Sequence, residues 1–216
     1  MITGGFLALA MSLATACAEP GASERASSPR ADSTLAALHR EGATFADFLA
    51  AAKNRKEQWQ RNYETAQLPD ALVTRARAAG PGSYRLLVVA ADGCSDSVNT
   101  IPYIARFAES VGIELRIIDT AKGQAVMEAH RTPDGRAATP TVVLLDEGDA
   151  EAGCFVERPQ ALVKVMTESR GKIPDGELFT KKMSWYDEDK GQETLRELVE
   201  ILEAARAGSP RCGPDA

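Results

Sequence analysis

Cys94 is the residue of this chain best placed for chemistry, because of the segment in which it lies. The run 85–91 is apolar after its first residue and reads as a buried strand. Asp92-Gly93-Cys94 then leads into an amphipathic segment, so Cys94 is expected at the start of a helix. A helix N-terminus presents free N–H groups and a partial positive charge, and both stabilise a thiolate. The pattern therefore predicts a redox-active or nucleophilic cysteine.

Ser97 stands three residues after Cys94, where a disulfide enzyme has its second, resolving cysteine. Three interpretations of Cys94 remain open. It acts as a single thiol, resolved by an external thiol or by another cysteine of the chain. In the second interpretation Cys94 works with Cys154. If Cys154 has no such role, it is expected to pack as a small apolar strand residue. In the third interpretation Cys94 has no catalytic role. Asp96, through its negative charge, and Ser97, through a hydrogen bond to the thiolate, are the candidate thiol-tuning residues.

Three further residues have a structural and a functional interpretation. Asp92 is expected to hydrogen-bond its own turn, with proton transfer as the alternative. His130 ends a short predicted helix and is expected to contact the last helical carbonyls rather than a ligand. Cys212 lies in a C-terminal tail that is expected to be loose, and Cys154, Cys94 or another chain are its candidate partners.

The N-terminal residues carry a targeting pattern. The segment 6–13 is apolar but too short to span a bilayer as a finished helix, and Ala14-Thr15-Ala16 ends like a secretory cleavage site. Leu13 to Cys17 resembles a bacterial lipoprotein signal, although no Lys or Arg precedes the apolar segment. We expect residues 1–16 to be a signal peptide and Cys17 to be acylated, anchoring an exported protein in the periplasm or cell envelope. An uncleaved N-terminal anchor is the alternative.

The composition excludes several classes of partner and cofactor. The chain has 216 residues, 44% of them hydrophobic, which favours one domain with extensions. A net charge of −6 without a basic tract argues against nucleic acid. Neither His39 nor His130 lies near a cysteine in the sequence, so a zinc site of the usual spacing is not predicted. No metal or organic cofactor is implied, and the oligomeric state stays open.

Hydrophobic periodicity indicates the elements that position Cys94. Residues 17–43 are rich in Ala, Ser, Gly and Pro and are predicted to be a flexible tether. Residues 44–206 are predicted to be the folded unit, and residues 207–216 a disordered tail. A helix is expected from Thr44 to about Leu68, followed by a second one to Ala79. Beyond these, strands at 86–91, 113–118, 141–146 and 153–156 alternate with helices at 97–111, 123–130 and 159–169, and a terminal helix follows at 192–206.

This β-α-β-α-β-β-α order, with a mixed four-stranded sheet, resembles the thioredoxin fold. Two prolines support the resemblance. Pro102 follows Cys94 by eight residues, where thioredoxins have a proline that kinks the helix. Thr139-Pro140 opens the third strand, where thioredoxins have a cis-proline that faces the active cysteine.

The chain is also similar to a bacterial branch of thioredoxin-like proteins that has an N-terminal helical extension. Gly93 to Ser97 corresponds to the Trp-Cys-x-Asp-x motif of that branch, and Trp185 to Glu197 corresponds to its C-terminal motif. The similarity covers residues 44–203. The chain departs from the pattern at Gly93, which replaces the tryptophan, and at Ser97, which replaces the resolving cysteine.

The resemblance implies thiol–disulfide exchange with thiols or disulfides of extracytoplasmic proteins. Cys94 would be the nucleophile, Thr139 and Pro140 would shape the substrate groove, and Cys154 would be a possible resolving residue. The competing hypothesis is a noncatalytic binding or scaffold lipoprotein of the cell envelope, which Ser97 favours. A thiol peroxidase is disfavoured, because no arginine lies close to Cys94 in the sequence.

Overall fold

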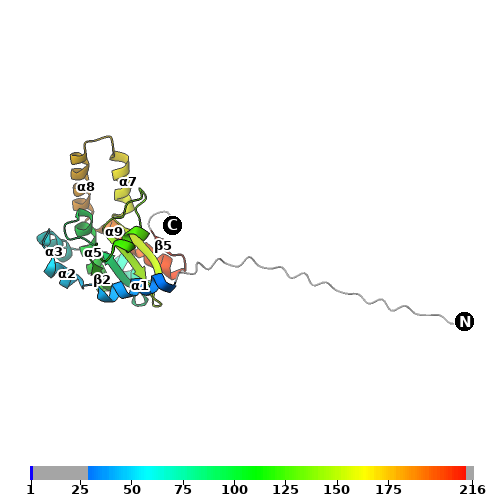
Figure 1. Cartoon of the computed structure of the whole chain (residues 1–216). Coiled ribbons are helices and arrows are strands. Elements are labelled where there is room, and N and C mark those ends of the chain that lie inside the picture. The colour runs from blue at the N-terminus through cyan, green and yellow to red at the C-terminus, as the bar shows by residue number, and fades with distance from the viewer. Residues whose placement is uncertain (2–28, 213–216) are drawn as a thin grey trace.

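The computed structural model describes Met1 and residues 29–212, and its centre is a mixed β-sheet. The strands lie in the order β2-β1-β3-β4-β5. Helices cover both faces of the sheet, while a pair of helices, α7 and α8, projects from one end of the molecule (Figure 1). The strands are β1 (Arg85–Val89), β2 (Glu114–Ile118), β3 (Thr141–Leu145), β4 (Glu151–Val156) and β5 (Arg211–Cys212). The helices are α1 (Pro29–Glu41), α2 (Phe45–Ala51), α3 (Lys56–Glu64), α4 (Asp70–Ala78), α5 (Ser95–Val111), α6 (Gln124–Ala129), α7 (Gln160–Ser169), α8 (Asp175–Asp189), α9 (Gln192–Arg206) and a 3-10 turn, η1 (Pro81–Ser83).

The sheet has the predicted thioredoxin-like connectivity. Strands β1 and β2 are parallel across the α5 crossover, and β3 pairs antiparallel with both β1 and β4. A fifth strand was not predicted. Arg211–Cys212 pairs parallel with β4, so this part of the tail expected to be disordered is ordered instead. Gly153 permits the approach, because a Cβ atom there would lie only 2.8 Å from the Arg211 carbonyl oxygen.

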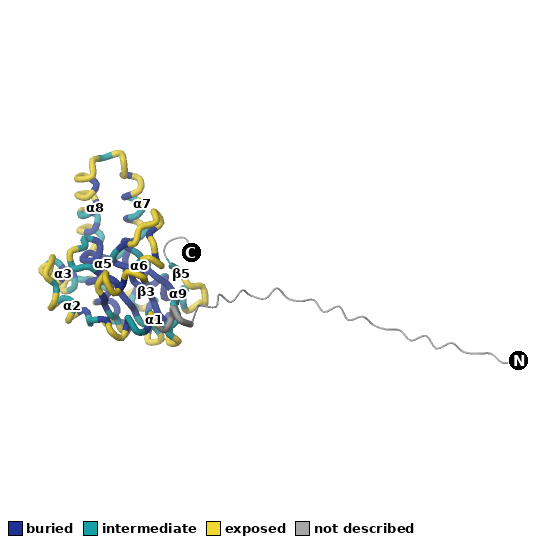
Figure 2. Tube along the Cα trace, viewed as in Figure 1, coloured by how far each residue is buried: buried dark blue, intermediate teal, exposed yellow. Residues whose placement is uncertain are grey.

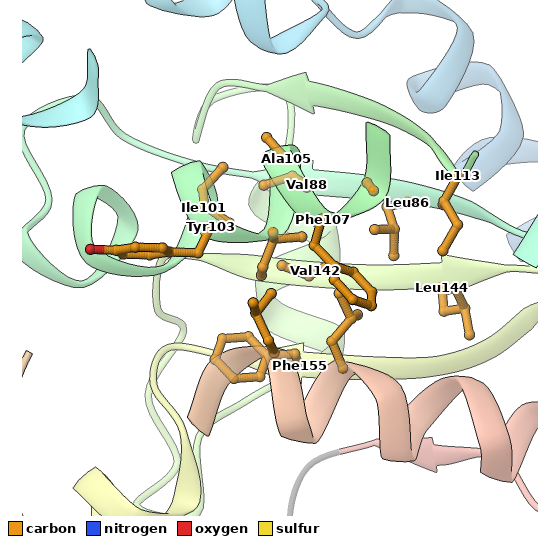
Figure 3. Close-up of a cluster of buried hydrophobic side chains, with 14 of the residues drawn as sticks. Leu86, Val88, Ile101, Tyr103, Ala105, Phe107, Ile113, Val142, Leu144 and Phe155 are labelled. Atoms are coloured by element: carbon orange, nitrogen blue, oxygen red, sulfur yellow. The ribbon is translucent and has the colours of Figure 1, made fainter. Parts of the chain in front are cut away.

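The central strands are buried on both faces, as expected for a sheet between two helical layers. Leu86, Val88 and Val142 point toward α5 and α9 in the larger core cluster (Figure 3). Leu87 and Val143 lie on the other face, in a cluster that includes α6 and side chains of α1. The buried residues concentrate in the sheet and α5, while the far ends of α7 and α8 are exposed (Figure 2). The strand–helix junction at Cys94 therefore joins two elements whose side chains are largely buried.

Helix α1 lies within the segment predicted to be a flexible tether. Ala36 and His39 are buried, and Leu35 and Leu38 pack on the cluster beneath β1. These side chains recur at three- and four-residue steps, a helical period that the surrounding Ala-rich composition obscured. Residues 17–28 of the predicted tether, which include Cys17, and the predicted signal peptide from residue 2 onward lie outside the described residues.

The helix predicted from Thr44 is divided in two. Thr44 is its N-cap as expected, because its Oγ1 accepts a hydrogen bond from the Asp47 N–H at 3.1 Å. The chain then leaves the helical conformation after Ala51, and Arg55 has a left-handed φ of 52°. The intervening loop contacts the Cys94 segment, which explains why local periodicity did not predict the break.

The C-terminal region adds a helix that was not predicted. Helix α8 packs on α7 through a small apolar cluster formed by Leu162, Met166, Leu178 and Tyr186. No helix in the described part of the chain is both long and apolar enough to span a bilayer.

Candidate functional site

Cys94 is the N-cap residue of α5. Its backbone is extended, with φ −72° and ψ 126°, and its Sγ accepts a hydrogen bond from the Ser97 N–H at 3.5 Å. The side chain is partly exposed, and Cys94 is the free thiol of the described residues. A partly exposed sulfur therefore faces an N–H group at the start of a 17-residue helix.

The Thr139–Pro140 peptide bond is cis, as predicted, and it lies beside this sulfur. The Cys94 thiol donates to the Thr139 carbonyl oxygen, with Sγ 3.2 Å from that oxygen. Pro140 is buried and Thr139 is partly exposed at the start of β3. The structure thus brings Cys94, Thr139 and Pro140 together, and Thr139 contacts the sulfur through its main-chain carbonyl.

Ser97 contacts the sulfur through its backbone and not through its hydroxyl, which differs from the predicted role. Its side chain is fully buried, and its Oγ finds no hydrogen-bond partner among the described residues. Position 97 faces the protein interior because it lies in the first turn of α5, above the sheet.

Asp96 is buried, and its carboxylate is fully engaged by three other side chains. Asp96 Oδ2 lies 2.9 Å from Lys182 Nζ and 3.3 Å from Arg158 Nη2, and Oδ1 accepts from the Tyr186 hydroxyl at 2.8 Å. Two cations at these distances offset the carboxylate charge. Asp96 is therefore not the uncompensated negative charge that was predicted to oppose the thiolate.

The partners of Asp96 come from segments that follow β4. Lys182 and Tyr186 lie four residues apart on one face of α8, and Lys182 also donates to Ser95 Oγ at 2.9 Å. Burial, followed by the charge of Asp96, raises the pKa of Tyr186 well above its ordinary value, so its hydroxyl stays a neutral donor. These residues lie 62 to 90 positions from Asp96, which sequence spacing did not reveal. The 178, 182, 186 spacing, interpreted as one helix face, was the available signal.

Asp92 binds a neighbouring loop and also, as expected, the backbone N–H of Gly93 in its own turn. Its carboxylate accepts from the backbone N–H groups of Lys53 and Asn54 at 2.8 and 3.0 Å, and from the Asn54 side-chain amide at 2.9 Å. The Asn54 hydrogen bond is the main reason that the pKa of Asp92 is lowered. Trp59 Nε1 donates to the Asp92 carbonyl oxygen at 2.9 Å. Asp92 therefore fastens the N-terminal helices to the cysteine loop, and an ionised carboxylate so occupied does not fit a proton relay.

Cys154 forms a disulfide with Cys212, so it is not available to resolve a mixed disulfide at Cys94. This pairing is one of the three that the sequence left open for Cys212. The prediction that Cys154 resolves a mixed disulfide at Cys94 is therefore wrong for the oxidised protein. The remaining candidates for resolution are external thiols.

One group of side chains in the described residues is close enough to hold a metal ion, and it does not include Cys94. His130, Glu151, Cys154 and Cys212 have their ligand atoms within 4.8 Å of one another. Three of them lie on β4 and β5 at the edge of the sheet and His130 follows α6, whereas Cys94 lies beside the start of β3.

A sheet of this topology, with a thiol at the first strand–helix junction opposite a cis-proline, defines the class of thioredoxin-like proteins. The chain belongs to the thioredoxin family, because a family model described as thioredoxin matches residues 42–170. The matched region includes Cys94, Thr139 and Pro140.

Two solved structures share the fold. A protein of unknown function from Pseudomonas aeruginosa is 24% identical, with a TM-score of 0.63, over 79% of this chain and 97% of its own. An HIV epitope-scaffold is 24% identical, with a TM-score of 0.62, over 78% of this chain and 97% of its own. No match was found among curated proteins. At this level of identity the likeness describes architecture alone.

Proposed function

We propose that this protein carries out thiol–disulfide exchange on extracytoplasmic proteins, with Cys94 as its single nucleophile. The observation that carries the proposal is the position of Cys94 Sγ, partly exposed between the Ser97 N–H at 3.5 Å and the Thr139 carbonyl at 3.2 Å. The N–H stabilises a thiolate, and the carbonyl accepts the thiol proton in the resting state.

The exchange proceeds in three balanced steps. The Cys94 thiolate attacks one sulfur of a substrate disulfide, the substrate S–S bond breaks, and the released substrate thiolate takes a proton from solvent. An external thiol, in its thiolate form, then attacks the mixed disulfide at the substrate sulfur or at Cys94. Attack at Cys94 frees the second substrate thiol, and a second external thiolate then restores Cys94 and leaves the external pair as a disulfide.

The surroundings of Cys94 support a poised thiol. The ion pair between Asp96 and Lys182, at 2.9 Å, supplies a cation for the carboxylate closest to the helix start. Gly93, which precedes Cys94, is exposed, and a Cβ atom there would lie 3.8 Å from Asn54 Cβ. Thr139 offers main-chain groups beside the sulfur to an extended substrate segment.

A noncatalytic binding role is the second candidate, and Ser97 favours it. A serine at this position cannot resolve a mixed disulfide, and its hydroxyl is buried without a hydrogen-bond partner among the described residues. In that case the surface around Pro140 would bind a partner without exchanging its disulfides.

The test is the reduction of a glutathionylated peptide by the full chain, with excess glutathione as the external thiol. We expect turnover in the parent protein, and a fall to the uncatalysed rate in the Cys94→Ser variant. The Ser95→Ala variant is the matched control, because it alters the neighbouring residue and keeps the sulfur. Equal rates in the parent and in Cys94→Ser would exclude Cys94 from the reaction and leave the binding role.

The extracytoplasmic location is part of this proposal and depends on the lipoprotein-type pattern that ends at Cys17. Acylation at Cys17 would anchor the protein to a membrane of the cell envelope. Mass spectrometry of the mature N-terminus, beside fractionation of a Cys17→Ser variant, checks it. A soluble parent with an unmodified Cys17 would contradict the anchor.

A further inference from the structure

The edge of the sheet at β4 and β5 gathers four metal-binding side chains from three separate segments. His130 follows α6, Glu151 and Cys154 lie on β4, and Cys212 lies on β5. His130 Nε2 is 3.0 Å from Glu151 Oε1, and the same oxygen is 3.6 Å from Cys212 Sγ. Cys154 Sγ is bonded directly to Cys212 Sγ.

The spacing of these atoms fits one tetrahedral ion. Zinc binds imidazole nitrogen and carboxylate oxygen at about 2.0–2.2 Å and thiolate sulfur at about 2.3 Å, which places tetrahedral ligands about 3.3–3.8 Å apart. All four ligand atoms already lie within 4.8 Å of one another. In the oxidised protein the disulfide holds the two sulfurs too close together to share an ion. Opening this bond is the change that the site requires.

The histidine is oriented as a metal ligand would be. His130 Nδ1 lies 2.7 Å from the Val126 carbonyl oxygen, so Nδ1 is the donor there and Nε2 faces Glu151. A main-chain carbonyl that fixes one ring nitrogen in this way is the usual support of a ligating histidine. Nε2 is therefore the ring nitrogen that would bind a divalent cation.

We propose that reduction of the Cys154–Cys212 disulfide converts this cluster into a zinc site with His130 and Glu151 as the other two ligands. A dithiol reductant gives two electrons and two protons, the S–S bond breaks, and the reductant becomes a cyclic disulfide. Zinc then displaces the two thiol protons, and its own charge does not change. The resulting set of two thiolates, one imidazole and one carboxylate is a ligand combination suited to Zn²⁺.

The location allows an ion to enter. His130 and Cys154 are buried, while Glu151 and Cys212 are partly exposed, so the site is open to solvent on one side. Two thiolates and one carboxylate carry three negative charges, of which Zn²⁺ neutralises two.

The experiment uses the full chain with Cys17→Ser and Cys94→Ser, so that the only remaining thiols come from the disulfide. The protein is reduced, freed of reductant without air, and titrated with Zn²⁺ against a chromophoric chelator, and with Co²⁺ as a spectroscopic probe. We expect one equivalent of zinc to bind after reduction, and a thiolate-to-cobalt charge-transfer band to appear. The oxidised protein should bind zinc at least about 100-fold more weakly.

Variants separate this site from adventitious thiol binding. Glu151→Gln and His130→Gln should each weaken zinc binding by at least about 10- to 100-fold, the loss seen even for outer-shell partners. The control variant Glu147→Gln, changed in the turn between β3 and β4, should bind zinc as tightly as the parent does. Circular dichroism confirms that each variant is folded. If His130→Gln does not fold, Glu151→Gln alone tests the proposal. Equal zinc binding by the oxidised and reduced proteins, or by Glu151→Gln and the parent, would overturn the proposal.

Discussion

The two cysteine regions of the fold differ in what surrounds the sulfur. Cys94 lies at a helix start, with polar main-chain groups on two sides and a buried ion-pair network at Asp96, two residues away. Cys154 lies within β4, opposite Val143, and its sulfur is bonded to Cys212 of the neighbouring strand. The first environment leaves a free, partly exposed thiol, whereas the second holds two sulfurs in register. The comparison shows that the position of a cysteine in the fold decides whether its sulfur stays free or forms a covalent crosslink.

The largest effect is expected from restoring the second cysteine at the Cys94 site. Ser97→Cys places a thiol three residues from Cys94, where it can resolve the mixed disulfide within the chain. We expect the multiple-turnover rate of disulfide reduction, with a dithiol as electron donor, to rise by about tenfold or more. Ser95→Cys, one residue from Cys94, is the control and should bring no such gain. An unchanged rate, although the two thiols of the variant do form a disulfide, would show that Cys94 is not a productive nucleophile.

Removing the crosslink should affect stability and leave exchange intact. The bond spans a sequence separation of 58 residues, and a loop of this size contributes about 4 kcal/mol in the chain-entropy description. Cys154→Ser combined with Cys212→Ser should lose about that much free energy of unfolding in urea. The same double variant should reduce the glutathionylated peptide at the parental rate, whereas Cys94→Ser should reduce it only at the uncatalysed rate. A double variant that loses exchange while remaining folded would contradict the division between the two regions.

Lys182→Met tests the network behind the cysteine. It removes one cation from the buried Asp96 carboxylate, and loss of one partner of a buried pair costs about 3 kcal/mol. The less compensated carboxylate should also slow alkylation of Cys94 at neutral pH, because a nearby negative charge disfavours the thiolate. Lys181→Met, whose ammonium group bonds Ser169 Oγ instead, is the matched control. Unchanged alkylation in a destabilised Lys182→Met protein would limit the network to a structural role.

The smallest effect concerns Glu197, whose carboxylate accepts a hydrogen bond from the Gln160 N–H at the start of α7. Burial, followed by the charges of Glu200 and Glu193, raises the pKa of Glu197 from 4.5 to about 7, although the Gln160 hydrogen bond opposes the rise. The pKa of Glu197 is higher in the folded state than in the unfolded state. Its contribution to the free energy of unfolding is therefore fully present below pH 4.5 and is lost as the pH rises through about 7. Glu197→Gln keeps an acceptor oxygen without the charge.

We therefore expect Glu197→Gln to be more stable than the parent at about pH 8, by on the order of 1 kcal/mol, and about equal to it at about pH 4. Urea unfolding at the two pH values measures the difference. A gain of the same size at both pH values would show that charge is not the cause.

The core of the fold was predictable because its signals are local. The apolar strand before Cys94, Pro102 and the Thr139-Pro140 step lie at fixed distances along the chain, and each marks a main-chain feature. The break before Arg55 was not predictable, because it depends on the distant Asp92 carboxylate. Periodicity within one segment contains no information about a partner that lies 38 positions away.

The chemical surroundings were less predictable than the fold. Asp96 was identified as a charge near the thiol, but its effect depends on Lys182 and Tyr186, which lie in a helix that was not predicted. Likewise, His130 has no cysteine near it in sequence, and the sheet brings Cys154 and Cys212 to it only once β5 pairs with β4. Such clusters are set by strand order, and a single sequence specifies strand order weakly.

The Cys154–Cys212 bond closes the polypeptide into a ring that contains α7, α8 and α9. Arg158, Lys182 and Tyr186, which all bind Asp96, belong to that ring. A protease that cuts once in the exposed connection after Ser169 would therefore release nothing, since both ends stay covalently joined. Only a later reduction would let the severed piece depart, carrying Lys182 and Tyr186 away from the helix that presents Cys94.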